Sequence, residues 1–228
     1  MLIGVLFVAT KILAFVPPLG IVFVLLMPIF IIGLMEGCRA LERGEALQLG
    51  HLVAGFRHNA SQLVTIGGLS LVGNLAVMMI VVWLGGDALA ALTKALSQGS
   101  SAPTPPAEAQ AAAAIASRAL LVGTLLSLPL LMALWYAPLL VYFHDLGTLA
   151  SLKWSLVGCL RNALPMLIYG LALLAAMFIA MPFAIGVRQF DLAFWLLAPV
   201  IAPSLYVSYK DIYVPGNTAH GEAGQRSR

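Results

Sequence analysis

The chain has few charged residues. Only 9% of its 228 residues are Asp, Glu, Lys or Arg, whereas 61% are hydrophobic. Ordinary soluble domains carry roughly 25% charged residues. The shortage of charge excludes a water-soluble domain, because a chain of this length cannot bury so much apolar surface in its own core. We therefore expect the lipid bilayer to surround most of the protein.

Motifs of catalysis and of nucleic-acid binding are also missing from the sequence. It contains no Walker loop, nucleophile elbow, pair of closely spaced cysteines or His-Glu zinc helix, and no basic patch interleaved with aromatic residues. Cys38 and Cys159 both fall on the predicted cytoplasmic side, where structural disulfides are rare. We expect no nucleic-acid partner, no metal and no cofactor.

Long apolar runs are what the sequence has instead. A bilayer core about 30 Å thick requires about 20 apolar residues in a helix. The runs 63–84 and 164–185 contain no charged residue, and in the run 119–143 the residues Pro129 and Pro138 offer two places for a kink. The runs predict five spanning helices, at 19–35, 63–84, 119–143, 164–185 and 192–209.

A sixth span is predicted at residues 1–16, which as a helix would be only ~24 Å long. No basic region precedes this apolar stretch and Lys11 lies inside it, which argues against a secretory signal peptide. The Pro-Pro-Leu-Gly turn at 17–20 then makes residues 1–35 a helical hairpin. The expected fold is an all-α integral membrane protein, a six-helix transmembrane bundle.

The distribution of Lys and Arg predicts the orientation of this bundle. Three of them lie on one side of the predicted spans, at Lys94, Arg118 and Arg188. Eight lie on the other, at Arg39, Arg43, Arg57, Lys153, Arg161, Lys210, Arg226 and Arg228. We expect a bacterial inner-membrane protein with a periplasmic loop at 85–118 and a disordered cytoplasmic tail at 214–228.

A short sequence unit occurs twice on the predicted cytoplasmic side. "LVAGFRHN" (52–59) returns 104 positions later as "LVGCLRN" (156–162), each time just before a spanning run. This placement predicts two parallel repeats, related by an axis along the membrane normal, each made of a span, a short helix and a span.

Each repeated unit belongs to a short helix with two faces. The first helix has an apolar row at Leu49, Leu52, Val53 and Phe56, opposite Gln48, His51, Gly55 and His58. The second has an apolar row at Leu149, Leu152, Leu156 and Leu160, opposite Thr148, Ser151, Ser155, Gly158 and Asn162. We expect both to lie in the interface or beneath the bundle, with Arg57, Lys153 and Arg161 reaching lipid head groups. The alternative is a gating or partner-docking helix.

Three segments carry a resemblance to a known family: "GCRALERGEALQLGHLVAGFR", "PLLVYFHDLGTLASLKWSLVGCLRNALP" and "APSLYVSYKDIY". Residues 17–213 resemble an uncharacterised family of proteobacterial multi-pass inner-membrane proteins. They are more distantly similar to the membrane domains associated with bacterial glycerophosphodiester phosphodiesterases. The resemblance implies a fold and a location. It also implies an aromatic and basic stretch before the first span, so a third copy of the short helix is expected upstream of Met1.

Few polar residues fall inside the predicted spans, where they are costly. Asn74 shares a helix face with Gly67, Ser70 and Gly73. We expect this face to pack closely against another helix, with the Asn74 amide donating a hydrogen bond across. The alternative is a path for a solute.

Charged residues at the inner rim offer a second group of candidates. By residue type, Glu36, His51, His144 and Asp145 could act together as metal ligands or as an acid and a base. A structural role competes with each. Arg39 can pair with Glu36 and Glu42 on its own helix, and Asp145 with Thr148 can begin the following helix.

Three functions follow from these residues. The first is a non-enzymatic scaffold or accessory subunit in envelope or lipid homeostasis, which acts with a membrane-protein partner or a second copy of the chain. The second is a small transporter or channel for a solute or lipid, with a path near Asn74. The third is a membrane enzyme that uses Glu36, His51, His144 and Asp145.

Overall fold

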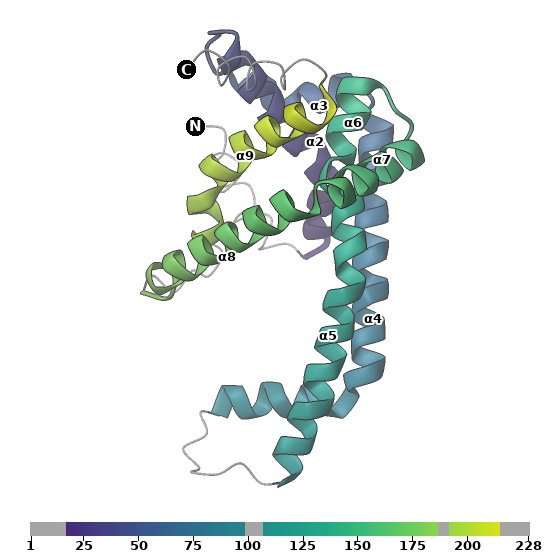
Figure 1. The fold of residues 1–228 in the computed structure, drawn as a ribbon, viewed down its shortest axis with the longest axis vertical. Helices are drawn as coiled ribbons and strands as arrows, with labels where there is room; N and C mark the ends of the chain where they lie inside the picture. The colour runs from purple at the N-terminus through teal and green to yellow at the C-terminus, as the bar shows by residue number, and fades with distance from the viewer. Residues whose placement is uncertain (1–16, 99–106, 187–191, 215–228) are drawn as a thin grey trace, which may run out of the picture. The chain divides into compact units, whose positions relative to one another are not determined.

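A computed structural model describes residues 17–98, 107–186 and 192–214, and all the elements in these ranges are helical. The expectation of an all-α protein is confirmed there. The predicted first span (1–16), Arg188 and nearly all of the tail 214–228 lie outside the described residues. The elements are α2 (Pro17–Glu42), the 3₁₀-helix η1 (Leu49–Val53), α3 (Ala54–Arg57), α4 (Ala60–Gln98), α5 (Ala107–Trp135), α6 (Ala137–His144), α7 (Thr148–Arg161), α8 (Ala163–Gly186) and α9 (Leu192–Tyr213) (Figure 1).

Four helical stretches in the described residues are long and apolar enough to cross a bilayer. They are Gly20–Glu42, Ala60–Ala91, Gln110–His144 and Ala163–Pro182. They coincide with four of the runs that the sequence predicts as spans. The chain is therefore a multi-pass membrane protein. The six-helix bundle and its internal repeat stay predictions.

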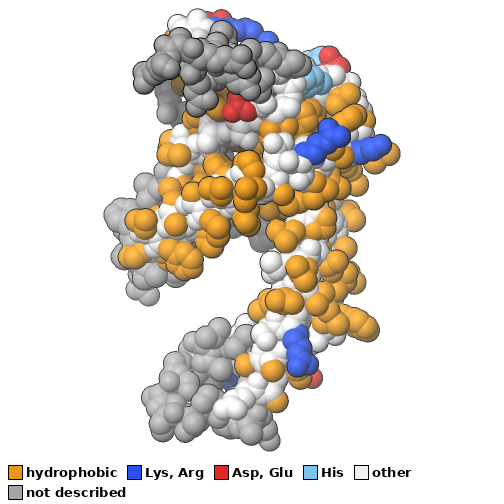
Figure 2. All heavy atoms as spheres, in the orientation of Figure 1, with side chains coloured by type: hydrophobic (Ala, Val, Ile, Leu, Met, Phe, Trp, Pro, Cys, Tyr) orange, Lys and Arg blue, Asp and Glu red, His pale blue; other side chains and the backbone are white. Residues whose placement is uncertain are grey.

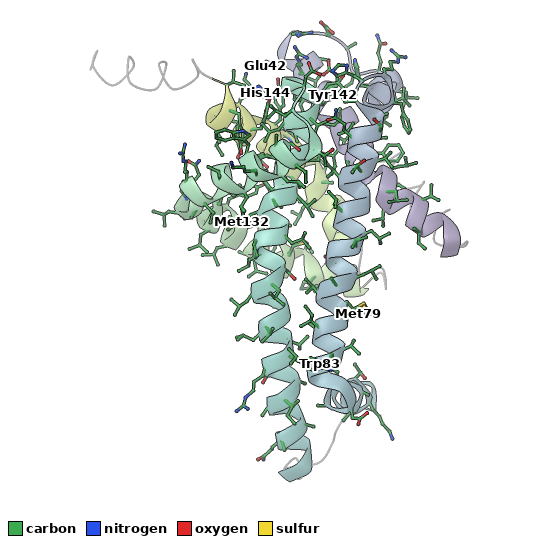
Figure 3. All side chains as sticks on the ribbon, turned by 90° about the vertical axis from the view of Figure 1, so that its right-hand side faces the viewer. Glu42, Met79, Trp83, Met132, Tyr142 and His144 are labelled. Carbon is green, nitrogen blue, oxygen red and sulfur yellow. The ribbon has the colours of Figure 1, made fainter. Side chains whose placement is uncertain are left out.

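The chain forms two compact units. The second unit, Leu69–Met132, is a helical hairpin in which α4 and α5 lie side by side (Figure 1). A Cβ added at Gly73 would meet Leu130, and one added at Gly123 would meet Val81. The partner position on α5 falls as the position on α4 rises, so the helices are antiparallel. Small residues at these contacts let the two backbones approach, which is how helices associate in lipid. Met79 and Trp83 project from α4 as exposed side chains (Figure 3).

Helix α4 runs past the predicted span. It bends at Gly86, whose φ of 31° lies in the region that favours glycine, and continues to Gln98. Helix α5 begins at Ala107. The predicted periplasmic loop 85–118 is therefore helical on both sides of residues 99–106, which lie outside the described residues. Its many Ala and Leu residues, which favour helix, account for the difference.

The first unit, Met1–Gly68 with Ala133–Arg228, is held around α2 by close approaches at glycine. A Cβ at Gly33 would lie 2.5 Å from the Leu52 Cα of η1, and one at Gly55 of α3 would lie 3.0 Å from Ile29 Cγ2. Gly67 of α4 faces the backbone of Leu25, with no room for a side chain. The connection after α2 thus folds back along α2.

The predicted kink at Pro138 is a complete break between α5 and α6. Proline lacks an N–H and clashes with the carbonyl four residues earlier, so it begins a new helix more readily than it continues one. Pro138 stands in the first turn of α6, and the N–H of Tyr136 donates to Ser155 Oγ of α7 at 2.9 Å. The short helix α6 is buried from Ala137 to Val141.

Helix α7 packs with its small polar face inward. Ser151, Ser155 and Gly158 of that face are buried, together with Cys159. In the opposite row Leu149 and Leu160 are 79% and 56% exposed, whereas Leu152 and Leu156 are half-buried. Exposed leucines on this row agree with the expected place of α7 in the membrane interface, which stays a prediction.

The first short helix differs from its prediction. It is split into the 3₁₀-helix η1 and the single turn α3. Leu52 is buried, but the other three residues of the predicted apolar row, Leu49, Val53 and Phe56, are exposed. Gly55, from the face predicted to be polar, also packs against α2, at Ile29. Close backbone approach at a glycine has outweighed burial of the larger side chains.

Adjacent glycines on α4 provide a test of this packing. Gly67→Ala places a methyl group against the Leu25 backbone, and we expect a loss of stability of about 1–3 kcal/mol, as in other overpacked sites. At Gly68 an added Cβ makes an ordinary contact, 3.8 Å from Leu25 Cδ2, so Gly68→Ala is the matched control and leaves stability unchanged or higher. Thermal unfolding in detergent measures both, and equal effects of the two variants would contradict the packing.

Candidate functional site

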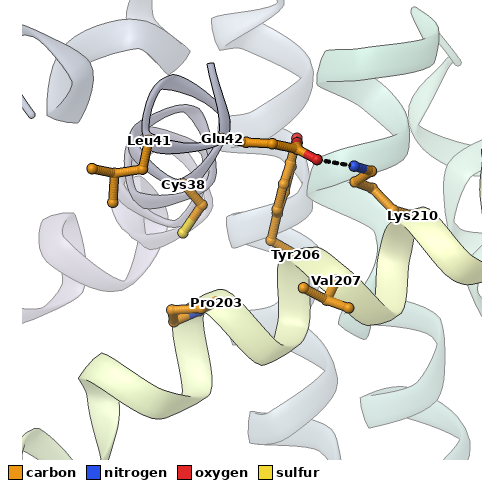
Figure 4. A pocket seen from close by; sticks show the side chains of 7 residues that line it. All are labelled: Cys38, Leu41, Glu42, Pro203, Tyr206, Val207 and Lys210. Atoms are coloured by element: carbon orange, nitrogen blue, oxygen red, sulfur yellow. Dashed lines mark hydrogen bonds and ion pairs between the residues drawn. The ribbon is translucent and has the colours of Figure 1, made fainter. Parts of the chain in front are cut away.

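An open groove lies between the C-terminal ends of α2 and α9, within the first unit (Figure 4). Its cavity volume is about 490 Å³. Leu41, Pro203 and Val207 give it apolar walls, and Tyr206 closes it from the protein side (Figure 4). The lining residues are Cys38, Leu41, Glu42, Pro203, Tyr206, Val207 and Lys210. Such a mixture of apolar walls and few polar groups is typical of small-ligand sites.

Glu42 is the polar centre of the groove. Its carboxylate forms an ion pair with Lys210 Nζ and accepts a hydrogen bond of 3.1 Å from the Tyr206 hydroxyl. Lys210 Nζ also lies 5.8 Å from the centre of the Tyr206 ring, a cation–π contact. These three side chains hold the end of α2 to the end of α9.

The predicted charge pairs on α2 are only partly formed. Glu36 and Arg39 do pair, at 3.6 Å. The predicted partner of Glu42 on its own helix was Arg39, but Glu42 pairs with Lys210, and Arg39 lies 5.4 Å from the centre of the Phe143 ring. One buried oxygen of Glu36 accepts no hydrogen bond.

Asp145 ties the end of α6 to the start of α4. Its carboxylate accepts hydrogen bonds from the Asn59 amide at 2.8 Å and from His58 Nε2 at 2.6 Å. Asn59 also donates to the Val141 carbonyl at 3.0 Å. Asn59 and Asp145 both have a positive φ, near 55°, which these residue types tolerate better than most. The Asn59 amide, and then the His58 ring, hold the pKa of the Asp145 carboxyl below its usual range.

The four rim candidates are therefore not brought together. His51 Nδ1 accepts a hydrogen bond from the Gln48 backbone at 3.2 Å, and the His144 ring stands edge-on to Tyr209. Asp145 bonds His58 and Asn59, not Glu36. The predicted helix start at Asp145 and Thr148 is wrong in detail, because Asp145 ends α6 and Gly147 precedes α7. Within the described ranges, no three His, Cys, Asp or Glu side chains are placed to hold a metal.

Asn74 lies in the second unit, on an exposed part of α4. Its amide donates to the Ser70 carbonyl at 2.7 Å, within its own helix. The predicted hydrogen bond across to another helix is not formed. On the face that Asn74 shares, Gly67 and Gly73 make the close helix contacts, against Leu25 and Leu130.

The three residues predicted to contact lipid head groups are exposed. Arg57 ends α3, while Lys153 and Arg161 lie on α7. Beside Lys153, the Trp154 carbonyl accepts a hydrogen bond of 2.9 Å from the Tyr213 hydroxyl, which fixes α7 to the end of α9.

An aromatic row also joins these elements, and the sequence analysis did not predict it. The centre of the Tyr209 ring lies 5.5 Å from that of Phe143 and 5.8 Å from that of Tyr213. The Tyr213 ring centre in turn lies 5.5 Å from that of Tyr136. Burial raises the pKa of the Tyr213 hydroxyl. Tyr142 and His144 lie near the same end of the first unit as Glu42 (Figure 3). The only sequence signal was the spacing of Tyr206, Tyr209 and Tyr213 along one face of α9.

Comparison with known proteins gives one informative similarity. The chain is 29% identical over 218 residues to a probable inner membrane protein of Burkholderia thailandensis, covering 90% of this chain and 78% of that protein. The chain is a multi-pass inner-membrane protein. No family model matches it, and no solved structure does. The similarity agrees with the resemblance to uncharacterised inner-membrane proteins, and it gives no link to the phosphodiesterases.

The tie at Asp145 predicts a dependence of stability on pH. A carboxyl whose pKa is lowered by folding stabilises the native state above its unfolded pKa of about 3.9, and this contribution is lost as the pH falls through the lower folded value. We expect Asp145→Asn to unfold at a temperature about 1–3 °C below wild type at pH 7. The difference should shrink below about pH 4.

Asp87→Asn, at another exposed aspartate, is the control for this measurement. Thermal unfolding in detergent from pH 3 to pH 8 records all three proteins. If the unfolding temperature of Asp145→Asn stays below that of wild type by the same amount down to pH 3, the ionised carboxylate is not what stabilises this contact, and the prediction is wrong.

Proposed function

We propose that the protein is a non-enzymatic inner-membrane scaffold or accessory subunit that presents α8 to another membrane protein. The observation that carries this proposal is the exposure of α8. None of its apolar stretch Ala163–Pro182 is buried, and Figure 2 shows hydrophobic side chains over it. Large exposed side chains follow the helix at Leu164, Leu167, Ile168, Leu171, Leu174, Phe178 and Ile179.

Lipid alone would cover an apolar helix, but α8 also offers a place for a second backbone. A Cβ at Gly170 would meet nothing within 4 Å, whereas the glycines at 33, 55 and 67 are each filled by a neighbouring backbone. Helices in lipid associate through such small residues, because they permit close backbone approach. Tyr169 meanwhile bonds Ser204 of α9 at 2.6 Å, which holds α8 in place.

The orientation belongs to the same proposal. Arg39 and Lys210 stand near the paired ends of α2 and α9, and Lys153 and Arg161 lie on α7, which is bonded to the end of α9. Positive residues favour the cytoplasmic side, so we place this end and the C-terminus in the cytoplasm. A role in envelope or lipid homeostasis belongs to the same proposal.

Crosslinking in cells tests the use of α8. With a photoreactive amino acid at Leu171, we expect irradiation to produce one discrete protein adduct. Gly170→Leu should reduce that adduct at least about fivefold by filling the open notch, and should leave the unfolding temperature unchanged because nothing lies within 4 Å. Ala172→Leu is the control, because it adds similar bulk at an exposed position about 160° round the helix from Gly170.

Two results would contradict the proposal. One is the absence of a protein adduct at Leu171 in protein that is correctly inserted in the membrane. The other is an adduct of equal yield in Gly170→Leu and wild type. Mass spectrometry of the adduct distinguishes a second copy of the chain from a different membrane protein.

A further inference from the structure

The groove between α2 and α9 combines accessible apolar surface with a fixed ion pair. Leu41 of α2 and Val207 of α9 both line the groove and are each 54% exposed. The buried Tyr206 forms its floor, and Glu42 with Lys210 forms one rim. A ligand that fits must therefore have an apolar part and a polar part next to each other.

The ion pair keeps unused hydrogen-bonding capacity. Glu42 is about half exposed, with its side chain 49% accessible, and a carboxylate has about four acceptor positions. Lys210 and Tyr206 each occupy one of them. Lys210 has three N–H donors, one of which points to Glu42. One additional donor at Glu42 and one additional acceptor at Lys210 can be accommodated without breaking the pair.

The groove lies where a head group would be. Arg39, Glu42 and Lys210 mark the ends of two apolar helices, and Tyr209 with Tyr213 stands beside them. Charged residues at helix ends with Tyr and Trp alongside are typical of the membrane–water interface. The apolar walls then face the first carbons of the acyl chains.

We propose that this groove binds a phospholipid with an ethanolamine head. The lipid phosphate accepts hydrogen bonds from Lys210, and its ammonium group donates to Glu42. The glycerol and upper acyl chains lie along Leu41, Pro203 and Val207. A cavity of about 490 Å³ is in the range of small-ligand sites, roughly 300–1,000 Å³.

Charge complementarity selects this head group over the other common ones. An anionic head such as glycerol phosphate brings no cation for Glu42, whose charge repels it. A choline head carries a positive charge but has no N–H to donate. The ethanolamine head offers one anion and one hydrogen-bonding cation, which match Lys210 and Glu42. The proposal does not depend on the scaffold function, because it concerns the purified chain alone.

Lipid titration of the purified, delipidated full-length protein, followed by native mass spectrometry, tests the proposal. The probes are phosphatidylethanolamine, phosphatidylcholine and phosphatidylglycerol with the same palmitoyl and oleoyl chains. We expect the first to bind at least about tenfold more tightly than the other two, since one charge-assisted hydrogen bond accounts for a factor of that size. Equal binding of the three lipids by wild type would overturn the proposal without any variant.

Two variants assign the preference to the groove. In Glu42→Gln, binding of phosphatidylethanolamine should fall about tenfold and binding of phosphatidylglycerol should rise, because the repelling charge is gone. In Lys210→Gln, binding of both lipids should fall. Arg118→Gln removes an exposed cation from α5, in the second unit, and should change neither.

A reversal of preference cannot arise from unfolding, so Glu42→Gln is informative even if its stability is lower. A wild-type preference that survives unchanged in both groove variants would place the lipid elsewhere. A loss of binding in Arg118→Gln equal to that in Lys210→Gln would indicate general attraction to basic residues and would also overturn the proposal.

Discussion

Close packing of helix backbones and a few hydrogen bonds between helices hold this protein together. In lipid, helices gain no hydrophobic free energy by associating, so packing and polar contacts must supply it. Tyr136 is where these contacts meet. Its N–H donates to Ser155 of α7, and its hydroxyl bonds Ser208 of α9. Its ring contacts Tyr213, whose hydroxyl returns to α7. One fully buried residue thus joins α6, α7 and α9.

The inward small face of α7 follows from this arrangement. Ser155 must lie close enough to accept from Tyr136, and a Cβ at Gly158 would overlap the Tyr213 hydroxyl. The thiol of Cys159 is buried on the same face, and burial raises its pKa to about 11. On the other face Leu149 and Leu160 are exposed. In the same way, Glu42 joins the end of α2 to α9 through Lys210, and Asp145 joins the end of α6 to the start of α4 through Asn59.

Sequence patterns could predict what depends on local composition and not what depends on distant partners. Four long helices and the break at Pro138 follow from uncharged runs and from the chemistry of proline. The partners of Glu42 and Asp145 do not, because Lys210 is 168 residues from the one and Asn59 is 86 residues from the other. Gly55 was assigned to a polar face, since a pattern cannot distinguish a solvated glycine from one that meets a backbone. For Asn74, the pattern indicated the correct helix face but not that the amide would bond its own helix.

Whether Leu160 of α7 faces lipid, water or protein tests the account most directly. A nitroxide label at Leu160→Cys, in a variant without other reactive thiols and reconstituted in bilayers, reports collisions with oxygen, which enters lipid, and with a water-soluble nickel chelate. If α7 lies in the membrane interface with the exposed Leu160 against lipid, as the account predicts, the label should collide mainly with oxygen. A label shielded from both reagents, or reached mainly by the nickel chelate, would show that the leucine row is buried in protein or exposed to water and would contradict the account.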